Sequence, residues 1–174
     1  MAFARHLIDV DLFTDAYRVS GKVAVGTGGI HSELGDPSSD FLELKQAYVS
    51  RIHQPGDIVA SYGQAAFRKN SINFILLNDR RDGIPTGSAH GPSVFTRGRP
   101  TPVFLTVPSF EIHGEIMYDG KATPGAVLVH SIGRFHPIFD ADAAASLYPE
   151  ISYSGDLILV HKERIGIFCL NTSS

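Results

Sequence analysis

Eight histidines are the residues of this 174-residue chain best suited to bind a metal ion or to move protons. Protein zinc sites combine His, Cys and carboxylate ligands at short spacings such as His-Glu-x-x-His. No such spacing occurs, and the nearest histidine pair, His130 and His136, spans an expected turn. Strand alternation would place His113 and Glu115 on a common face, where they could form a surface metal pair. We therefore predict scattered, mostly exposed histidines, no metal site and no cofactor.

Nucleophilic catalysis would require a hydroxyl or thiol beside a base and an oxyanion donor. The closest sequences are Ser88-Ala89-His90 and His31-Ser32-Glu33, and there is no G-x-S-x-G. The stretch Val25–Gly29 is rich in glycine but lacks the lysine of a phosphate-binding P-loop. The single cysteine, Cys169, lies in the apolar run Ile165–Leu170, which predicts a small buried side chain. We assign no catalytic residue and favour a non-enzyme.

Basic side chains gather in a Gly/Pro-rich connector and at two expected strand-to-strand turns. These candidate binding residues are Arg80, Arg81, Arg97, Arg99, Lys69, Lys162 and Arg164. The formal net charge is nevertheless −3, and no exposed aromatic residue alternates with the basic ones, as it does in single-strand binders. Nucleic-acid binding through these residues is therefore an alternative and not the leading interpretation.

The chain contains an internal repeat. Val10–Asn78 aligns with Val103–Asn171 at a nearly constant offset, with one insertion and one compensating deletion. Residue classes agree along the unit, and identical residues include Gly21/Gly114 and Lys69/Lys162. This alignment predicts a first β repeat over residues 1–78, a connector over 79–101 and a second β repeat over 102–174.

Alternation of apolar and polar residues predicts strands through most of each unit. Glycine in an apolar phase at Gly21 and Gly114 predicts a bulge, a sharp bend or a close backbone approach in both copies. In the second copy, Asp140–Leu147 contains good helix formers and predicts a short helix in place of part of a strand. The elements expected in the first copy are strands at Leu7–Thr14, Tyr17–Val25 and Phe41–Ile52, a loop with one helical turn near Ile30–Leu34, a turn at Pro55–Asp57, and a hairpin of Val59–Arg68 with Ile72–Leu77.

Each unit thus has about five strands and a short helical excursion, and so small a sheet must curl to bury its apolar face. In strand number and length the unit resembles the SH3-like and Sm-like small β-barrels. The resemblance implies an all-β fold with minor helix, made of two tandem pseudo-symmetric barrel-like or curled-sheet repeats. It assigns no functional residue, because no motif of either family occurs in the sequence.

Two runs, Ile72–Leu77 and Ile165–Leu170, are apolar on both strand faces. Such strands are usually covered on both sides, so the other repeat or another chain must cover them. We therefore predict a non-enzymatic scaffold or adaptor that binds a protein partner or forms homo-oligomers. The alternatives are the nucleic-acid binder described above and a small-molecule or metal-binding domain. No signal peptide and no apolar run of about 18 residues is seen, so we expect a cytoplasmic protein without a membrane span.

Overall fold

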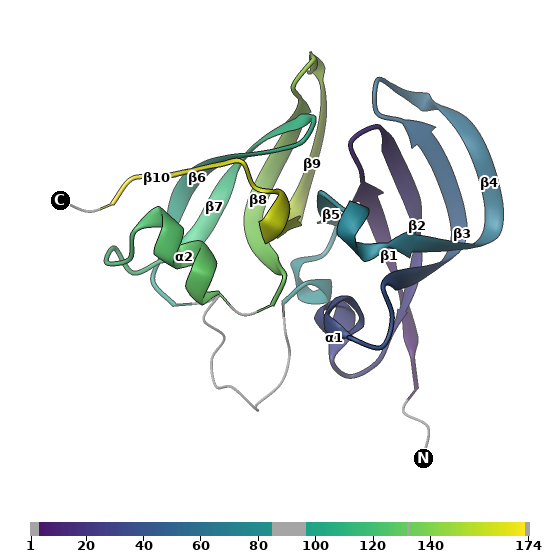
Figure 1. The fold of residues 1–174 in the computed structure, drawn as a ribbon, viewed down its shortest axis with the longest axis horizontal. Coiled ribbons are helices and arrows are strands. Elements are labelled where there is room, and N and C mark those ends of the chain that lie inside the picture. The colour runs from purple at the N-terminus through teal and green to yellow at the C-terminus, as the bar shows by residue number, and fades with distance from the viewer. Residues whose placement is uncertain (1–3, 85–96, 132, 173–174) are drawn as a thin grey trace.

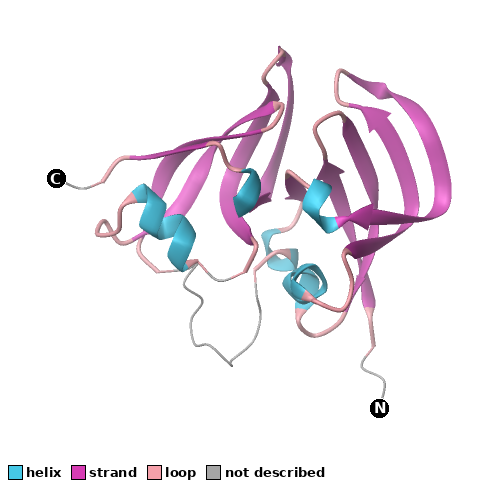
Figure 2. Cartoon of the chain, viewed as in Figure 1, coloured by secondary structure: helices cyan, strands magenta, loops and turns pink. Residues whose placement is uncertain are grey.

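The computed structural model describes residues 4–84, 97–131 and 133–172. In these residues ten strands form one antiparallel sheet in the order β10-β6-β7-β8-β9-β5-β1-β2-β3-β4 (Figures 1 and 2). The prediction of an all-β fold with minor helix is confirmed. The elements are β1 His6–Phe13, β2 Tyr17–Val25, α1 Gly29–Gly35, β3 Phe41–Arg51, β4 Gln54–Arg68, β5 Phe74–Leu77, β6 Arg99–Val107, β7 Phe110–Tyr118, α2 Pro124–His130, β8 Phe135–Ala145, β9 Tyr148–His161 and β10 Ile167–Leu170, with 3₁₀ turns at Lys69–Ser71, Arg80–Asp82 and Lys162–Arg164.

The same order of elements occurs before and after the connector. Each half runs strand, strand, helix, strand, strand, 3₁₀ turn and strand, and corresponding strands begin 93 or 94 positions apart. The strand order within the sheet also matches, since β5-β1-β2-β3-β4 corresponds to β10-β6-β7-β8-β9. The sheet is not closed, and among the described residues its two ends are β10 and β4.

Local sequence explains why these elements form. The alternation in β1 buries Ile8, Val10 and Leu12 on one face, as expected for a half-buried strand. In α2, Pro124 occupies the first turn, and the hydroxyl of Thr123 accepts a hydrogen bond from the backbone N–H of Ala126 at 3.2 Å. This side-chain cap satisfies one of the free N–H groups at the start of the helix.

The two glycines singled out in the sequence lie at equivalent bulges. The register of β2 against β3 shifts at Gly21, and that of β7 against β8 shifts at Gly114. A Cβ at Gly21 would lie 2.8 Å from Leu44 Cδ2 and 3.3 Å from the backbone oxygen of Lys45, and the predicted close backbone approach is therefore confirmed. Opposite the bulges, Gln46 and Asp140 have φ of 53° and 45°, a left-handed conformation that is costly for residues other than glycine.

The two halves share their cores across the pairing of β5 with β9. One hydrophobic cluster belongs mainly to the first half but includes four residues of the second: Phe135, Phe139, Leu157 and Leu159. The other belongs mainly to the second half but includes four residues of the first: Phe13, Ile52, Phe74 and Leu76. Each half therefore completes the core of the other.

The run Ile72–Leu77 is fully buried, because β5 lies between β1 and β9 in the sheet. Of the two covers expected for this run, the other part of the chain or another chain, the structure shows the first, since residues of the second half pack against it. The corresponding strand β10 pairs with β6 on one edge and, among the described residues, forms the end of the sheet. Its Ile167 is 55% exposed and Cys169 is also exposed, so the predicted burial of Cys169 is wrong.

Two other predictions about strands and turns are wrong. Val59–Arg68 and Ile72–Leu77 are not a hairpin, because the 3₁₀ turn Lys69–Ser71 turns the chain away and β5 pairs with β1 and β9. The turn expected at Pro55–Asp57 falls inside β4, and the chain reverses instead at Ile52–His53.

The predicted helix over Asp140–Leu147 is also wrong, because Phe135–Ala145 forms the continuous strand β8. Ala141, Ala143 and Ala145 are all buried, which is the period of two that a strand requires. Packing in the sheet thus overrides the helix propensity of alanine.

Neither seven-residue α-helix is long enough to cross a membrane, and no other helix of the described residues is.

Candidate functional site

A polar network crosses the junction of the two halves near the start of β5. The side-chain amide of Asn73 donates to the carbonyl of Pro108 at 3.0 Å and to the carboxylate of Asp15 at 2.9 Å. Arg164 donates to the Asn73 side-chain oxygen at 2.9 Å and pairs with Asp15 at 2.8 Å. Arg164, predicted as a binding residue, therefore links the two halves. The sequence signal that could have revealed the network is a lone asparagine inside an apolar run.

The two predicted lysines make the same structural contact in the two halves. Lys69 is 3% exposed, and its Nζ donates to the carbonyl of Asp36, just after α1, at 3.0 Å. Lys162 Nζ donates to the carbonyl of Ser131, just after α2, and partial burial lowers its pKa. Both ammonium groups thus satisfy carbonyls at helix C-termini, where the helix dipole favours positive charge.

Two of the predicted connector arginines lie in the 3₁₀ turn Arg80–Asp82 and form ion pairs. Arg80 pairs with Asp140 at 3.0 Å, and its guanidinium lies over the ring of Phe139. Arg81 pairs with Asp79 at 2.6 Å, and its hydrogen bonds lower the pKa of that carboxyl. These contacts reduce the positive charge available to a phosphate backbone.

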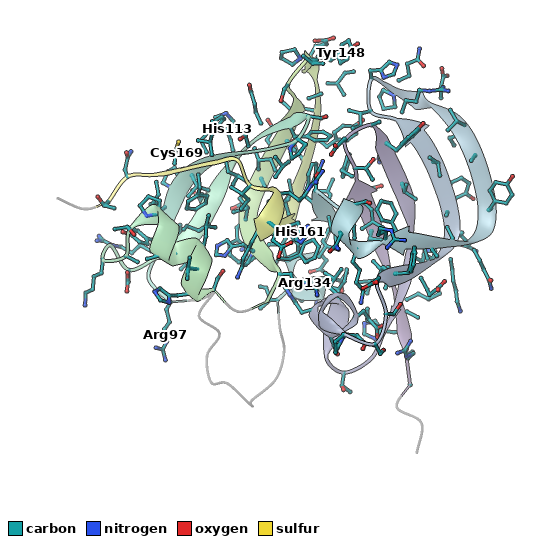
Figure 3. The ribbon with its side chains drawn as sticks, in the orientation of Figure 1. Arg97, His113, Arg134, Tyr148, His161 and Cys169 are labelled. Carbon is teal, nitrogen blue, oxygen red and sulfur yellow. The ribbon has the colours of Figure 1, made fainter. Side chains whose placement is uncertain are left out.

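The other two predicted arginines follow the undescribed part of the connector, residues 85–96, where Ser88-Ala89-His90 also lies. Arg99 begins β6 and is exposed. Arg97 is exposed beside α2, below the second half of the sheet (Figure 3). The seven predicted residues are thus divided among the junction, two helix ends, a 3₁₀ turn and the start of β6.

A cavity of about 300 Å³ lies between α2 and strands β7 and β8. Its walls are mainly apolar, and Arg97, Asp119, His130 and His136 supply most of its polar groups. The two histidines considered as a pair in the sequence thus meet at one cavity. Among the described residues there is no cluster of three His, Cys, Asp or Glu side chains that could hold a metal ion.

Two histidines, His136 and His161, are buried in strands, although the sequence predicted mostly exposed histidines. Burial lowers the pKa of His136 to about 4, with a smaller contribution from Lys162. His161 is 1% exposed and lies at the junction (Figure 3). Its Nδ1 donates to the carbonyl of Ile72 at 3.2 Å, and burial also lowers its pKa. Both rings are therefore neutral at pH 7.

His31 and Glu33, from the stretch considered for catalysis, take part in contacts around α1. His31 Nε2 donates to the carbonyl of Gly83 at 2.5 Å, and burial lowers the pKa of the ring. Glu33 pairs with Arg5 at 3.1 Å. These bonds connect α1 to Gly83, which follows the 3₁₀ turn Arg80–Asp82, and to Arg5, which precedes β1.

The most unusual surface of the described structure is the end of the sheet formed by β3 and β4. Five large apolar side chains on these strands are between 39% and 71% exposed: Phe41, Tyr48, Ile58, Val59 and Tyr62. The opposite end, β10, exposes Ile167 and Cys169. Figure 1 shows β4 and β10 at opposite ends of the molecule. An open strand edge with apolar side chains is a template for pairing with another chain.

Chemically, these two ends can bind an extended strand through backbone N–H and C=O groups and through apolar contacts on either side. The sequence identified the apolar run in β10 but not the exposed side chains of β3 and β4. Comparison with protein-family models, curated proteins and solved structures finds no match for this chain.

Proposed function

We propose that this protein is a non-enzymatic scaffold subunit that joins a protein assembly through the open ends of its sheet. The observation that carries the proposal is the exposure of apolar side chains on the two end strands, with Tyr62 71% exposed on β4 and Ile167 55% exposed on β10. Monomeric proteins usually protect such edges with charge, proline or a covering loop. Strand addition would cover these side chains and satisfy the free backbone groups together.

We further propose that the chain is a tandem duplication of one curled β unit. The equal element order supports this, as do the equivalent bulges opposite Gln46 and Asp140. The contacts of Lys69 and Lys162 with helix ends support it independently. A duplicated unit suits a scaffold, because each copy carries the same type of pairing edge.

The distribution of charge favours a scaffold over the nucleic-acid alternative. Arg80, Arg81 and Arg164 pair with carboxylates, and Lys69 is buried. Non-specific nucleic-acid binding depends on basic groups that are free to neutralise phosphates.

Sedimentation velocity of the purified chain, together with size fractionation of a lysate that contains it, tests the scaffold proposal. We expect species larger than the monomer in at least one of the two measurements. Replacement of Tyr62 by Lys should shift the chain toward the monomer, because a charge would have to be buried at the paired edge. A matched control is Leu147→Lys, since Leu147 is 85% exposed but lies in the β8–β9 turn.

A wild-type chain that is monomeric at every concentration and also monomeric in the lysate would exclude the scaffold proposal. Equal loss of assembly in the Tyr62 and Leu147 variants would exclude the sheet edge as the site.

A further inference from the structure

The two end strands of the sheet are the counterparts of the two strands that join the halves within the chain. β4 corresponds to β9, and β10 corresponds to β5, by their positions in the repeated order of elements. β9 pairs with β5 inside the molecule, whereas their counterparts are at opposite ends (Figure 1). The molecule therefore contains both sides of a junction that it already makes once.

The internal junction shows what that pairing requires. Its register sets Phe74 against Val160 and Leu76 against Ile158. Phe74 and Leu76 enter the core of the second half, although they belong to the first. The strand contributed by one half thus fills a core of the other, and β5 is buried on both faces.

The corresponding strand β10 has only one of its faces packed. Phe168 and Leu170 pack against the core of the second half. Ile167 and Cys169, the counterparts of Phe74 and Leu76, are exposed. The face that inserts into a neighbouring core at the internal junction is therefore uncovered at the end of the sheet.

The end strand β4 offers the complementary surface. Phe67 and Ala65 pack against the core of the first half, as their counterparts Val160 and Ile158 do in the second. On the other face of this edge Phe41, which pairs in register with Arg68, is 39% exposed. Its counterpart Phe135 is 2% exposed and packs in the core that the two halves share.

Two residues at the ends of the sheet differ in size from their counterparts at the internal junction. Inside the chain, Gly155 leaves room for Leu76, whose Cδ1 atom would collide with a Cβ at that position. At the ends of the sheet the counterpart of Gly155 is Tyr62, and the counterpart of Leu76 is the smaller Cys169. At the internal junction a large residue thus faces a small one. The same pairing between two copies would set the small Cys169 against the large Tyr62.

From these relationships we propose that β10 of one molecule pairs with β4 of a second copy, in the register of the internal junction. This inference rests on the scaffold proposal and names its partner as another copy of this chain. The predicted pairs are Ile167 with Phe67, Phe168 with Ala66, Cys169 with Ala65 and Leu170 with Gln64. The contact is head-to-tail, so it generates a closed ring or an open filament.

The junction between copies is weaker than the junction within the chain. The counterpart of Asn73 is Gly166, which has no side chain to form the polar network. On β4, Gln64 and Ala66 replace Leu157 and Leu159, so less apolar surface is covered. Association is therefore reversible and depends on concentration.

Disulfide formation tests the register directly, because Cys169 is the single cysteine of the chain. Opposed residues of antiparallel strands have Cβ atoms about 4.5–5.5 Å apart, near the spacing of a disulfide. Ala65→Cys places a second cysteine at the other end of the molecule. After mild oxidation this variant should give a ladder of covalent dimers, trimers and larger species on a non-reducing gel.

Three control chains define the geometry. Wild type, and the variant that combines Ala65→Cys with Cys169→Ser, each have one cysteine and should stay uncrosslinked. A mixture of these two chains should give dimers and nothing larger. Ala60→Cys, in the same strand but out of register, should give no ladder. The melting temperature of the reduced Ala65→Cys chain should equal that of wild type, which would show that the variant is folded.

A second variant tests the contact without a disulfide. Ile167→Lys alters a side chain that is already exposed. The melting temperature of this variant should therefore equal that of wild type, while the variant should be more monomeric. Retention of wild-type assembly in this variant would overturn the inference.

Other outcomes separate the inference from the scaffold proposal on which it rests. Dimers from either single-cysteine chain alone would indicate like-with-like pairing and overturn the head-to-tail arrangement. Assembly of wild type without a ladder from Ala65→Cys would overturn the register but leave the scaffold proposal standing. A wild type that is monomeric both when purified and in the lysate, with no ladder from Ala65→Cys, would overturn both.

Discussion

Arg164 and Asn73 lie 91 positions apart in the chain, yet the arginine Nε donates to the asparagine side-chain oxygen at 2.9 Å. The contact connects the 3₁₀ turn after β9 with the residue that precedes β5. It therefore lies where the two cores meet, and several measurable properties depend on this region.

Asn73→Ala should lower the free energy of unfolding by about 2–3 kcal/mol, because the partly buried carbonyl of Pro108 and the guanidinium of Arg164 each lose a partner. Urea denaturation measures the change. Asn78→Ala is the matched control, since Asn78 is exposed at the end of β5 and should change stability by less than about 0.5 kcal/mol. Equal effects of the two substitutions would contradict a role for the network.

Gly155→Ala should destabilise the fold by about 1–3 kcal/mol, because the added methyl group collides with Leu76 where the halves join. Thermal melting measures the effect. Gly63→Ala, in the counterpart strand β4, meets no atom within 4 Å and should be neutral or slightly stabilising. A neutral Gly155→Ala would show that β5 and β9 are less tightly packed than described.

Gln46→Gly should stabilise the protein by roughly 0.5–1 kcal/mol. The left-handed conformation at φ 53° costs a residue with a Cβ about 1–2 kcal/mol, which exceeds the entropic cost of glycine. Glu43→Gly is the control, because Glu43 is exposed in the same strand and glycine should weaken it there. Chemical denaturation of both variants is sufficient, and a loss of stability in Gln46→Gly would refute the account of the bulge.

Stability should decrease as the pH falls from about 6.5 to 4. The folded state favours neutral His136, whose pKa is about 4, and burial also lowers the pKa of His161. The unfolded chain takes up protons first, so the stability is fully present above pH 6.5 and is lost progressively below it. For His136 the loss amounts to about 3 kcal/mol at pH 4.

Unfolding free energies measured across this pH range check the prediction. His136→Phe should flatten the dependence, because it removes the buried imidazole whose pKa is lowered to about 4. A stability that rises toward pH 4 would have the wrong sign and would contradict the burial of both rings.

Local pattern was enough to predict most of the strands and an irregularity at Gly21 and Gly114, but it wrongly predicted a helix over Asp140–Leu147 in β8. The alternation of Ile8, Val10 and Leu12 predicted β1, and the in-phase Gly21 predicted a close approach, since both depend only on neighbours in the chain. The pairing of strands could not be predicted in this way. The course of the chain after Lys69–Ser71 depends on β9, which is far away in sequence.

In the candidate site, too, the residue types could be predicted from local sequence, whereas their burial and their partners could not. The apolar character of Ile165–Leu170 was evident, but the exposure of Cys169 was not, because burial depends on what lies beyond the edge of β10. The basic residues were evident too, yet the carboxylates that neutralise Arg80 and Arg164 come from distant parts of the fold. Ion pairs of this kind cannot be deduced from spacing.

The exchange of side chains between the two cores has a consequence for how the molecule can be divided. A fragment that ends after residue 84 would retain all five strands of its unit but would leave Phe74 and Leu76 bare, and its own core would lack Leu157 and Leu159. We therefore expect that neither half is an autonomous folding unit. The two halves should melt together in a single cooperative transition.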